Sequence, residues 1–186
     1  TNYTGNQNTA VGSTALKVVS TGSNNAALGY NVLAANTTGG NNAAFGASVL
    51  NANTTGGSNT AVGQNAMLLA TTTSNHTAIG FGTLDSMLTG ANNDTEGNTV
   101  LGYNAGTAIT YGGSNILLGY QAGDALTTGN ANIAIGYDID LPSNTASNQL
   151  SIGNLIFGTG IDGTGTTLST GSIGIGTTTP GGKFSV

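Results

Sequence analysis

A five-residue motif returns along the chain at an almost constant spacing, and this repeat limits the possible folds more than any other feature of the sequence. Each copy ends in a glycine that follows an apolar residue, as in Asn8-Thr9-Ala10-Val11-Gly12. The ten marker glycines are Gly12, Gly29, Gly46, Gly63, Gly80, Gly102, Gly119, Gly136, Gly153 and Gly176. Seven of the nine intervals between them are 17 residues long, and the other two are 22 and 23 residues. Such a unit is too short for two packed helices, which need about 33 residues, so it favours one turn of a β-solenoid.

The residue before each marker glycine is apolar in all ten copies, and we predict that this column forms the core ladder. Its members are Val11, Leu28, Phe45, Val62, Ile79, Leu101, Leu118, Ile135, Ile152 and Ile175. Side chains alternate along a strand, so the residue one place earlier points to the opposite face. That residue is Ala in six copies, among them Ala27 and Ala44. We predict that these small side chains form a contact face at which neighbouring chains approach closely.

These patterns predict an all-β chain in which like residues of successive repeats stack into a parallel β-roll, or β-solenoid, of about ten 17-residue rungs. We assign residues 1–153 to the repeat domain and residues 154–186 to a fibre-end or transition segment that carries the last, degenerate copy. Rungs stacked at roughly 4.8 Å form a rod on the order of 45–50 Å long. Because a thin rod has little core for its surface, we expect an obligate homo-oligomer, and a three-fold bundle accommodates three contact faces about one axis.

The repeat resembles the head repeat of trimeric autotransporter adhesins (YadA-like), whose consensus is close to Ser-Val-Ala-Ile-Gly. Ala61-Val62-Gly63, Ala78-Ile79-Gly80 and Ala134-Ile135-Gly136 match the Ala-aliphatic-Gly core of that consensus. Similar Asn-Thr-Ala-Val-Gly repeats occur in bacteriophage tail fibres, and residues 171–186 are similar to the segment that precedes the self-cleaving chaperone of many such fibres. The resemblance implies a homotrimer of left-handed parallel β-rolls at the cell surface, outside the cell, or in a virion tail fibre.

The composition excludes several classes of protein. Two Lys+Arg among 186 residues leave no basic patch for phosphates, so we expect no nucleic-acid binding. No apolar run approaches the ~20 residues of a membrane-spanning helix, so we expect no membrane insertion in this segment. The chain has no Cys, one His and seven Asp+Glu, which leaves few groups for acid–base, nucleophilic or metal chemistry. We therefore expect no enzymatic activity, no cofactor and no metal.

Aromatic residues follow the marker glycine in five copies, and Tyr103, Tyr120 and Tyr137 are consecutive. The favoured interpretation is a cross-rung ladder that covers the backbone at a corner. The alternative is a stripe that contacts a receptor, for which these three tyrosines are the best candidates. The longer interval before Gly102 also contains Asp94 and Glu96. Insertions in solenoids map to loops, often on the binding face, so we add both acids to the candidate receptor contacts; a tolerated surface loop is the favoured alternative.

Two further features have both a structural and a chemical interpretation. His76 occupies the column that is Asn in seven other copies, and a substitute in an Asn ladder is favoured over a metal or catalytic role. Asp138 and Asp140 are two residues apart and have the chemistry to flank a cation or a glycosidic bond. A solvated edge is the favoured interpretation of this pair.

The sequence thus predicts a structural extracellular fibre or adhesin segment, a rigid trimeric rod for surface attachment or receptor contact. Its expected partners are further copies of itself and a host-surface or matrix receptor or glycan of unknown identity. Open ladder ends also make end-to-end stacking into filaments a related expectation. Two alternatives stay open: an ice- or glycan-binding β-solenoid, indicated by the regularly spaced Thr, and a polysaccharide-degrading phage tail spike.

Overall fold

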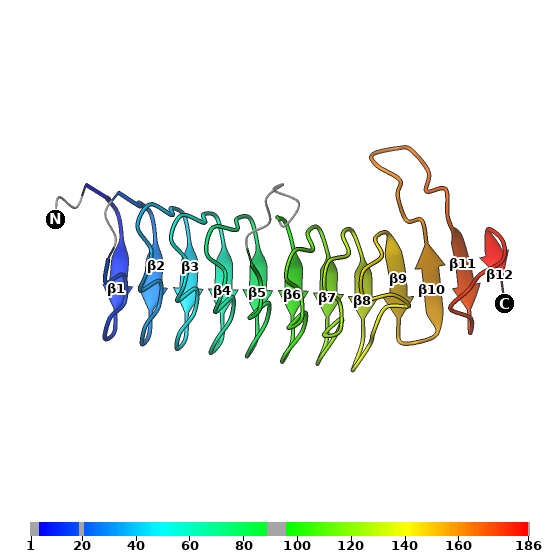
Figure 1. Ribbon diagram of the computed structural model, residues 1–186, viewed down its shortest axis with the longest axis horizontal. Helices are drawn as coiled ribbons and strands as arrows, with labels where there is room; N and C mark the ends of the chain where they lie inside the picture. The colour runs from blue at the N-terminus through cyan, green and yellow to red at the C-terminus, as the bar shows by residue number, and fades with distance from the viewer. Residues whose placement is uncertain (1–3, 19–20, 89–95, 186) are drawn as a thin grey trace.

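The computed structural model describes residues 4–18, 21–88 and 96–185, and within these ranges it contains short β-strands and no helix. The strands lie side by side in chain order in one 12-stranded sheet (Figure 1). Their bounds are β1 Thr9–Val11, β2 Ala26–Leu28, β3 Ala43–Phe45, β4 Thr60–Val62, β5 Thr77–Ile79, β6 Thr99–Leu101, β7 Ile116–Leu118, β8 Ile133–Ile135, β9 Gln149–Ile152, β10 Ile156–Thr159, β11 Ser172–Ile175 and β12 Phe184–Ser185.

From β1 to β9 each strand pairs in parallel with the next, and equivalent residues of successive repeats stand opposite each other. Val11 pairs with Leu28, for example, and Leu28 pairs with Phe45. The longer interval before Gly102 does not disturb this register, because Ile79 still pairs with Leu101. The prediction of an all-β solenoid in which one 17-residue repeat makes one turn is confirmed for these strands.

The predicted assignment of the two strand faces is wrong, because the Ala column lies in the core and the column before the glycines points outward. Ala27 and Ala44 are 1% and 0% exposed, whereas Val11, Leu28 and Leu101 are 55%, 49% and 50% exposed. Phe45 is also exposed, and the rest of the predicted core ladder is half-buried, namely Val62, Ile79, Leu118, Ile135, Ile152 and Ile175.

The alanines point inward because of the residues on the opposite wall of each turn, which follows the marker glycine. The third and fourth residues after the glycine point inward there, and Leu33, Leu50 and Met67 are 0% exposed. In these turns the long side chains fill the narrow space between the two walls, so the strand wall has room only for the methyl group of an alanine. The core is thus a stack of large turn residues against small strand residues.

The marker glycines hold the corner at which each strand ends. At Gly29 the backbone has a φ of +134°, and a Cβ built there would overlap the carbonyl oxygen of Gly46 in the next turn. A side chain is therefore excluded both by the backbone conformation and by the close stacking of successive corners. Gly153 and Gly176 differ, because no atom lies within 4 Å of a Cβ built at either.

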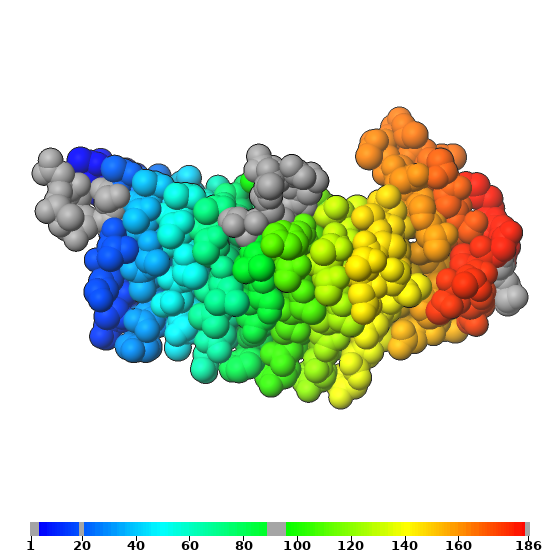
Figure 2. Space-filling view, in the orientation of Figure 1, coloured from blue at the N-terminus to red at the C-terminus, as the bar shows by residue number. Residues whose placement is uncertain are grey.

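Beyond β9 the winding changes, so the prediction of about ten equal rungs is wrong for the last copy. Strand β10 runs antiparallel to both β9 and β11, and β12 pairs in parallel with β11. The final motif, which ends at Gly176, therefore reaches the sheet through a hairpin and not by another turn. The connection between β10 and β11 projects from the rod (Figures 1 and 2).

Candidate interaction surface

The outward side chains of the strands form an uncharged two-column surface, aliphatic in one column and mixed Thr, Ala and aliphatic in the other, which we call the aliphatic strip. One column contains the residues before the marker glycines, and its parallel register from β1 to β9 is continuous. The other column contains Thr9, Ala26, Ala43, Thr60, Thr77, Thr99, Ile116, Ile133 and Leu150. Neither column contains a charged residue.

One column of the strip continues past the reversal of strand direction, whereas the other is interrupted at Gly158, which stands opposite Leu150 and Ile173. Ile156 of β10 stands opposite Ile152 on one side and Ile175 on the other, and Ile173 also faces outward with 40% exposure. Eleven strands at roughly 4.8 Å make the strip on the order of 50 Å long. Soluble monomers rarely expose contiguous apolar patches larger than a few hundred Å². A surface of this length and regularity is therefore the strongest candidate for a binding interface on the described chain.

An aromatic ladder follows the second half of the rod, one residue beyond the corner glycines. The ring centroids of Phe81, Tyr103, Tyr120 and Tyr137 are 5.2, 5.2 and 5.0 Å apart in succession. Their planes differ by 11°, 8° and 9°, so the rings form a near-parallel stack. The interpretation as a cross-rung ladder is confirmed. All four aromatic residues stay exposed, and Tyr137 is the most exposed at 74%.

Of the two acids of the insertion, only Glu96 belongs to the described residues. Asp94 lies outside the described residues. Glu96 is exposed, its Oε2 accepts a hydrogen bond from Asn75 Nδ2 at 2.9 Å, and its backbone oxygen accepts one from Ser114 N at 2.8 Å. These bonds tie Glu96 to the turns before and after it and not to the aromatic ladder. Receptor contact by the tyrosines or these acids stays a prediction.

A buried ladder of amide side chains runs inside the rod, and His76 is one of its members. In a typical link, Asn25 Oδ1 accepts from the backbone N–H of Asn42 at 3.0 Å, and Asn25 Nδ2 donates to Gly39 O at 2.9 Å. His76 takes over the acceptor role, since its Nδ1 accepts from Asn98 N at 3.2 Å. Within the described residues His76 Nε2 has no hydrogen-bond partner. Burial lowers the pKa of His76 to about 4, so the ring is neutral at pH 7. The interpretation as a ladder substitute is confirmed.

Three acids gather near one another at the turns before β9. Burial, followed by the charges of Asp140 and Asp138, raises the pKa of Asp124 above its usual value. Asp138 and Asp140 are exposed, and Asp140 Oδ1 accepts a hydrogen bond from Ala125 N at 3.3 Å. Among the described residues no three His, Cys, Asp or Glu side chains are arranged to hold a metal ion. The geometry is that of a solvated edge.

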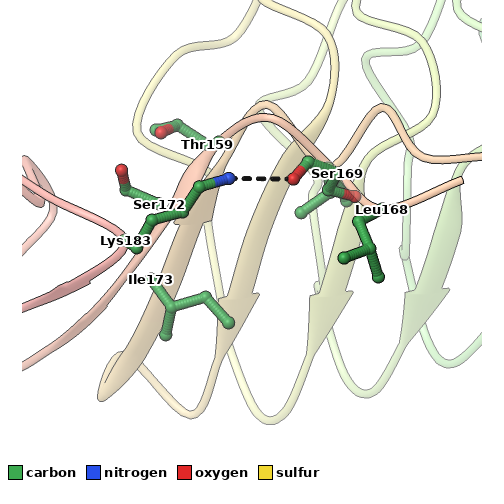
Figure 3. Close-up of a pocket in the computed structure, with 8 residues that line it drawn as sticks. Thr159, Leu168, Ser169, Ser172, Ile173 and Lys183 are labelled. Atoms are coloured by element: carbon green, nitrogen blue, oxygen red, sulfur yellow. Dashed lines mark hydrogen bonds between the residues drawn. The ribbon is translucent and has the colours of Figure 1, made fainter.

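A hollow of about 400 Å³ lies beneath the projecting β10–β11 connection. Its walls include Ile161, Leu168 and Ile173, and Lys183 reaches across it (Figure 3). Lys183 Nζ donates to the backbone oxygens of Ser169 at 3.0 Å and Thr170 at 2.9 Å. The lysine therefore acts as a strut that fastens the connection. Sequence reasoning missed this hollow because the segment has no repeat pattern; the 23-residue interval before Gly176 was the one signal of a departure from the solenoid.

These features define the class of molecule: the chain is a β-solenoid repeat protein. Comparison with protein-family models, curated proteins and solved structures gives no match. Across the described residues, no helix has the length and apolarity that crossing a bilayer requires.

Proposed function

We propose that the chain is a non-enzymatic structural segment of an extracellular, cell-surface or virion fibre, in which three copies associate side by side through the aliphatic strip. The observation that carries this proposal is the strip itself, an uncharged and largely aliphatic outward surface that keeps one parallel register from β1 to β9 and continues in one column to Ile175. Left-handed winding and three-fold symmetry are supported by the resemblance to trimeric adhesin heads and tail fibres. The resulting rod would serve as a rigid spacer and an adhesive surface.

The composition of the strip, more than its size, supports lateral association. A surface on the order of 50 Å long and roughly 12 Å wide presents on the order of 600 Å², taking the width from two columns of side chains on a strand. This area is less than the roughly 800 Å² that one partner buries in a standard interface, and in a trimer it would be shared between two neighbouring copies. Three strips that converge on an axis parallel to the rods would bury one another and close the assembly. Because the strip has no charged residue, convergence would bury no unpaired charge.

Threefold display supports the adhesive part of the proposal. Three copies would present three aromatic ladders, each with three exposed tyrosines whose rings are spaced by about one rung. Weak contacts made by several identical sites gain strength when they bind one surface together. An ice-binding surface would need an unbroken Thr array, and the outward column has only Thr60, Thr77 and Thr99 as consecutive threonines. Because the Thr array is broken, we propose a role in a fibre and not ice binding.

The test measures the mass of the assembly in solution. Sedimentation equilibrium or native mass spectrometry of the chain should give three copies, and Leu101→Asp should lower the mass to that of one copy. Tyr111→Asp is the matched control, because Tyr111 is 44% exposed against 50% for Leu101 but lies in a connection outside the strip. Circular dichroism should show that both variants keep their β-structure. A well-folded monomeric wild-type chain, or a Leu101→Asp variant that still trimerises, would contradict lateral association through the strip.

A further inference from the structure

The aromatic ladder is a periodic surface whose spacing is fixed by the backbone beneath it. In each of its last three turns, the residue after the ring donates its backbone N–H, at 2.8 Å, to the carbonyl oxygen of the aromatic residue one turn earlier. The three pairs are Asn104 with Phe81, Gln121 with Tyr103 and Asp138 with Tyr120. Because these bonds belong to the solenoid itself, the rings are ordered before any ligand arrives, which lowers the entropic cost of binding.

The ladder carries unused hydrogen-bonding groups on an exposed surface. Tyr103, Tyr120 and Tyr137 are 45%, 40% and 74% exposed. Across the described part of the chain their hydroxyl groups make no hydrogen bond, so each keeps a donor and an acceptor for a ligand. The residues that follow them form a polar row of two amides and a carboxylate, namely Asn104, Gln121 and Asp138. A sugar ring has the matching chemistry, because it combines apolar C–H groups with a rim of hydroxyls.

The spacing of the ladder selects among linear ligands. A chain that contacts several turns in the same way must repeat at the ring spacing of 5.0 to 5.2 Å. An extended polypeptide does not, because side chains on one face recur every two residues, or roughly 6.6 Å. Nucleic acid is disfavoured by a formal net charge of −5 with only two Lys+Arg. An extended β-1,4-linked glycan advances by close to one rung per sugar, so successive sugars would meet successive rings in the same way.

The charges around the ladder narrow the class of glycan. Asp138 belongs to the polar row, and Asp124 Oδ2 accepts a hydrogen bond from Gln121 Nε2 at 3.3 Å. The chain's two Lys+Arg residues, Lys17 and Lys183, lie in other turns. A polyuronate or a sulfated glycan would therefore meet repulsion along this row without a compensating cation. The surface fits an uncharged glycan.

We propose that the aromatic ladder binds an uncharged, extended β-1,4-linked glycan along the rod, with one sugar per turn. The tyrosine hydroxyls and the polar row exchange hydrogen bonds with sugar hydroxyls, and the rings contact the C–H groups of the sugars. The ladder of Phe81, Tyr103, Tyr120 and Tyr137 limits the site to four consecutive sugars. This inference rests on the adhesive part of the proposed function but needs only one copy; three copies would add avidity.

The first measurement compares soluble oligosaccharides by isothermal titration calorimetry with the full chain. Cellotetraose should bind about tenfold more tightly than cellobiose, because it occupies twice as many turns of the ladder. Cellohexaose should gain only about a further threefold, from its additional registers on the same four rings. Maltotetraose is the matched control: it has the same composition, but its α-linkage coils the chain out of register with the rings. It should bind about tenfold more weakly than cellotetraose.

A substitution that keeps the ring identifies the surface. Tyr120→Phe removes one hydroxyl and should weaken cellotetraose binding about fivefold, the loss of one hydrogen bond. Tyr111→Phe is the matched control, because Tyr111 is 44% exposed against 40% for Tyr120 but lies outside the ladder, and it should leave binding unchanged. Equal binding of cellotetraose and maltotetraose, affinity independent of chain length, or equal affinity of the two variants would overturn the proposal.

Sedimentation of the same samples reads lateral association separately. A single copy that binds cellotetraose would contradict the trimer and leave the glycan site standing. A trimer that binds no cellotetraose would overturn the glycan site and leave the trimer standing.

Discussion

At the residue scale, the buried amide ladder shows how one side chain can join three turns. The Oδ1 atom of Asn115 accepts the backbone N–H of Asn132 at 2.9 Å, and its Nδ2 donates to Asn98 Oδ1 and to Gly129 O, both at 3.0 Å. Each link satisfies backbone groups that would otherwise be buried without a partner, which costs about 1–3 kcal/mol per group. An imidazole has one acceptor and one donor at fixed positions, so His76 reproduces the acceptor bond alone within the described residues.

The histidine at position 76 makes the stability of the protein sensitive to acid, because the asparagines of the ladder do not titrate. The pKa of His76 is about 4 in the folded chain against 6.5 for an unperturbed histidine, so the unfolded chain binds more protons between these values. The contribution of His76 to the free energy of unfolding is therefore fully present above pH 6.5 and is lost as the pH falls toward 4. The loss is on the order of 3 kcal/mol. His76→Asn should lose less stability over this range in urea unfolding at matched protein concentration. Asn115→His should add acid sensitivity, and parallel pH profiles for wild type and His76→Asn would contradict this account.

At the element scale, the inward side chains of each strand and of the opposite turn together fill a core of fixed width. In most turns a small strand residue faces a large turn residue, as Ala44 faces the turn of Leu50. At β7 the sizes are exchanged: the strand carries Leu117 and the turn carries Gly123, where a Cβ would lie 2.7 Å from Leu117 Cδ2. Gly123 has a φ of +62°, close to the +48° of Leu50, so the backbone accepts a leucine there. The exchange keeps the core filled without changing the winding.

A double-mutant cycle tests this exchange. Leu117→Ala alone should cost about 2–5 kcal/mol through the cavity that it leaves. Gly123→Leu alone should also destabilise, because its side chain meets Leu117, and overpacking costs about 1–3 kcal/mol. The combined variant reproduces the Ala44 and Leu50 arrangement and should be more stable than either single variant in chemical denaturation. Additive losses would show that the two positions do not share one space.

The same elements show what the sequence alone could predict. The 17-residue spacing of the glycines was sufficient to predict the solenoid fold and the strand register in which Val11 pairs with Leu28. The spacing was not sufficient to predict which strand residues point into the core, because Ala27 and Leu28 are both apolar. The width of the turn decides which of the two fits inside. The aliphatic strip was consequently mistaken for the core. The β10 hairpin could not be placed either, since strand direction after Gly153 depends on pairing that no repeat encodes.

At the scale of the whole molecule, the charged residues lie outside the aliphatic strip. The chain has a formal net charge of −5, yet the aliphatic strip has no charged residue in either column. Hydrophobic association is weakly affected by simple salts, whereas contacts between exposed charges weaken as the Debye length falls from about 10 Å at 0.1 M salt to about 3 Å at 1 M. A trimer that forms through the strip should therefore persist across this range.

The measurement is the dissociation constant of the assembly by sedimentation at about 0.1 M and about 1 M sodium chloride. We expect a change of less than about threefold, with any change toward tighter association because added salt screens the repulsion between chains of equal charge. Sodium sulfate, which strengthens apolar burial, should tighten the assembly further. The Leu101→Asp chain is the control, since any association that it retains no longer depends on an uncharged strip. A tenfold weakening of the wild-type assembly in 1 M salt would mean that charged groups in the connections hold the copies together and that the strip has another partner.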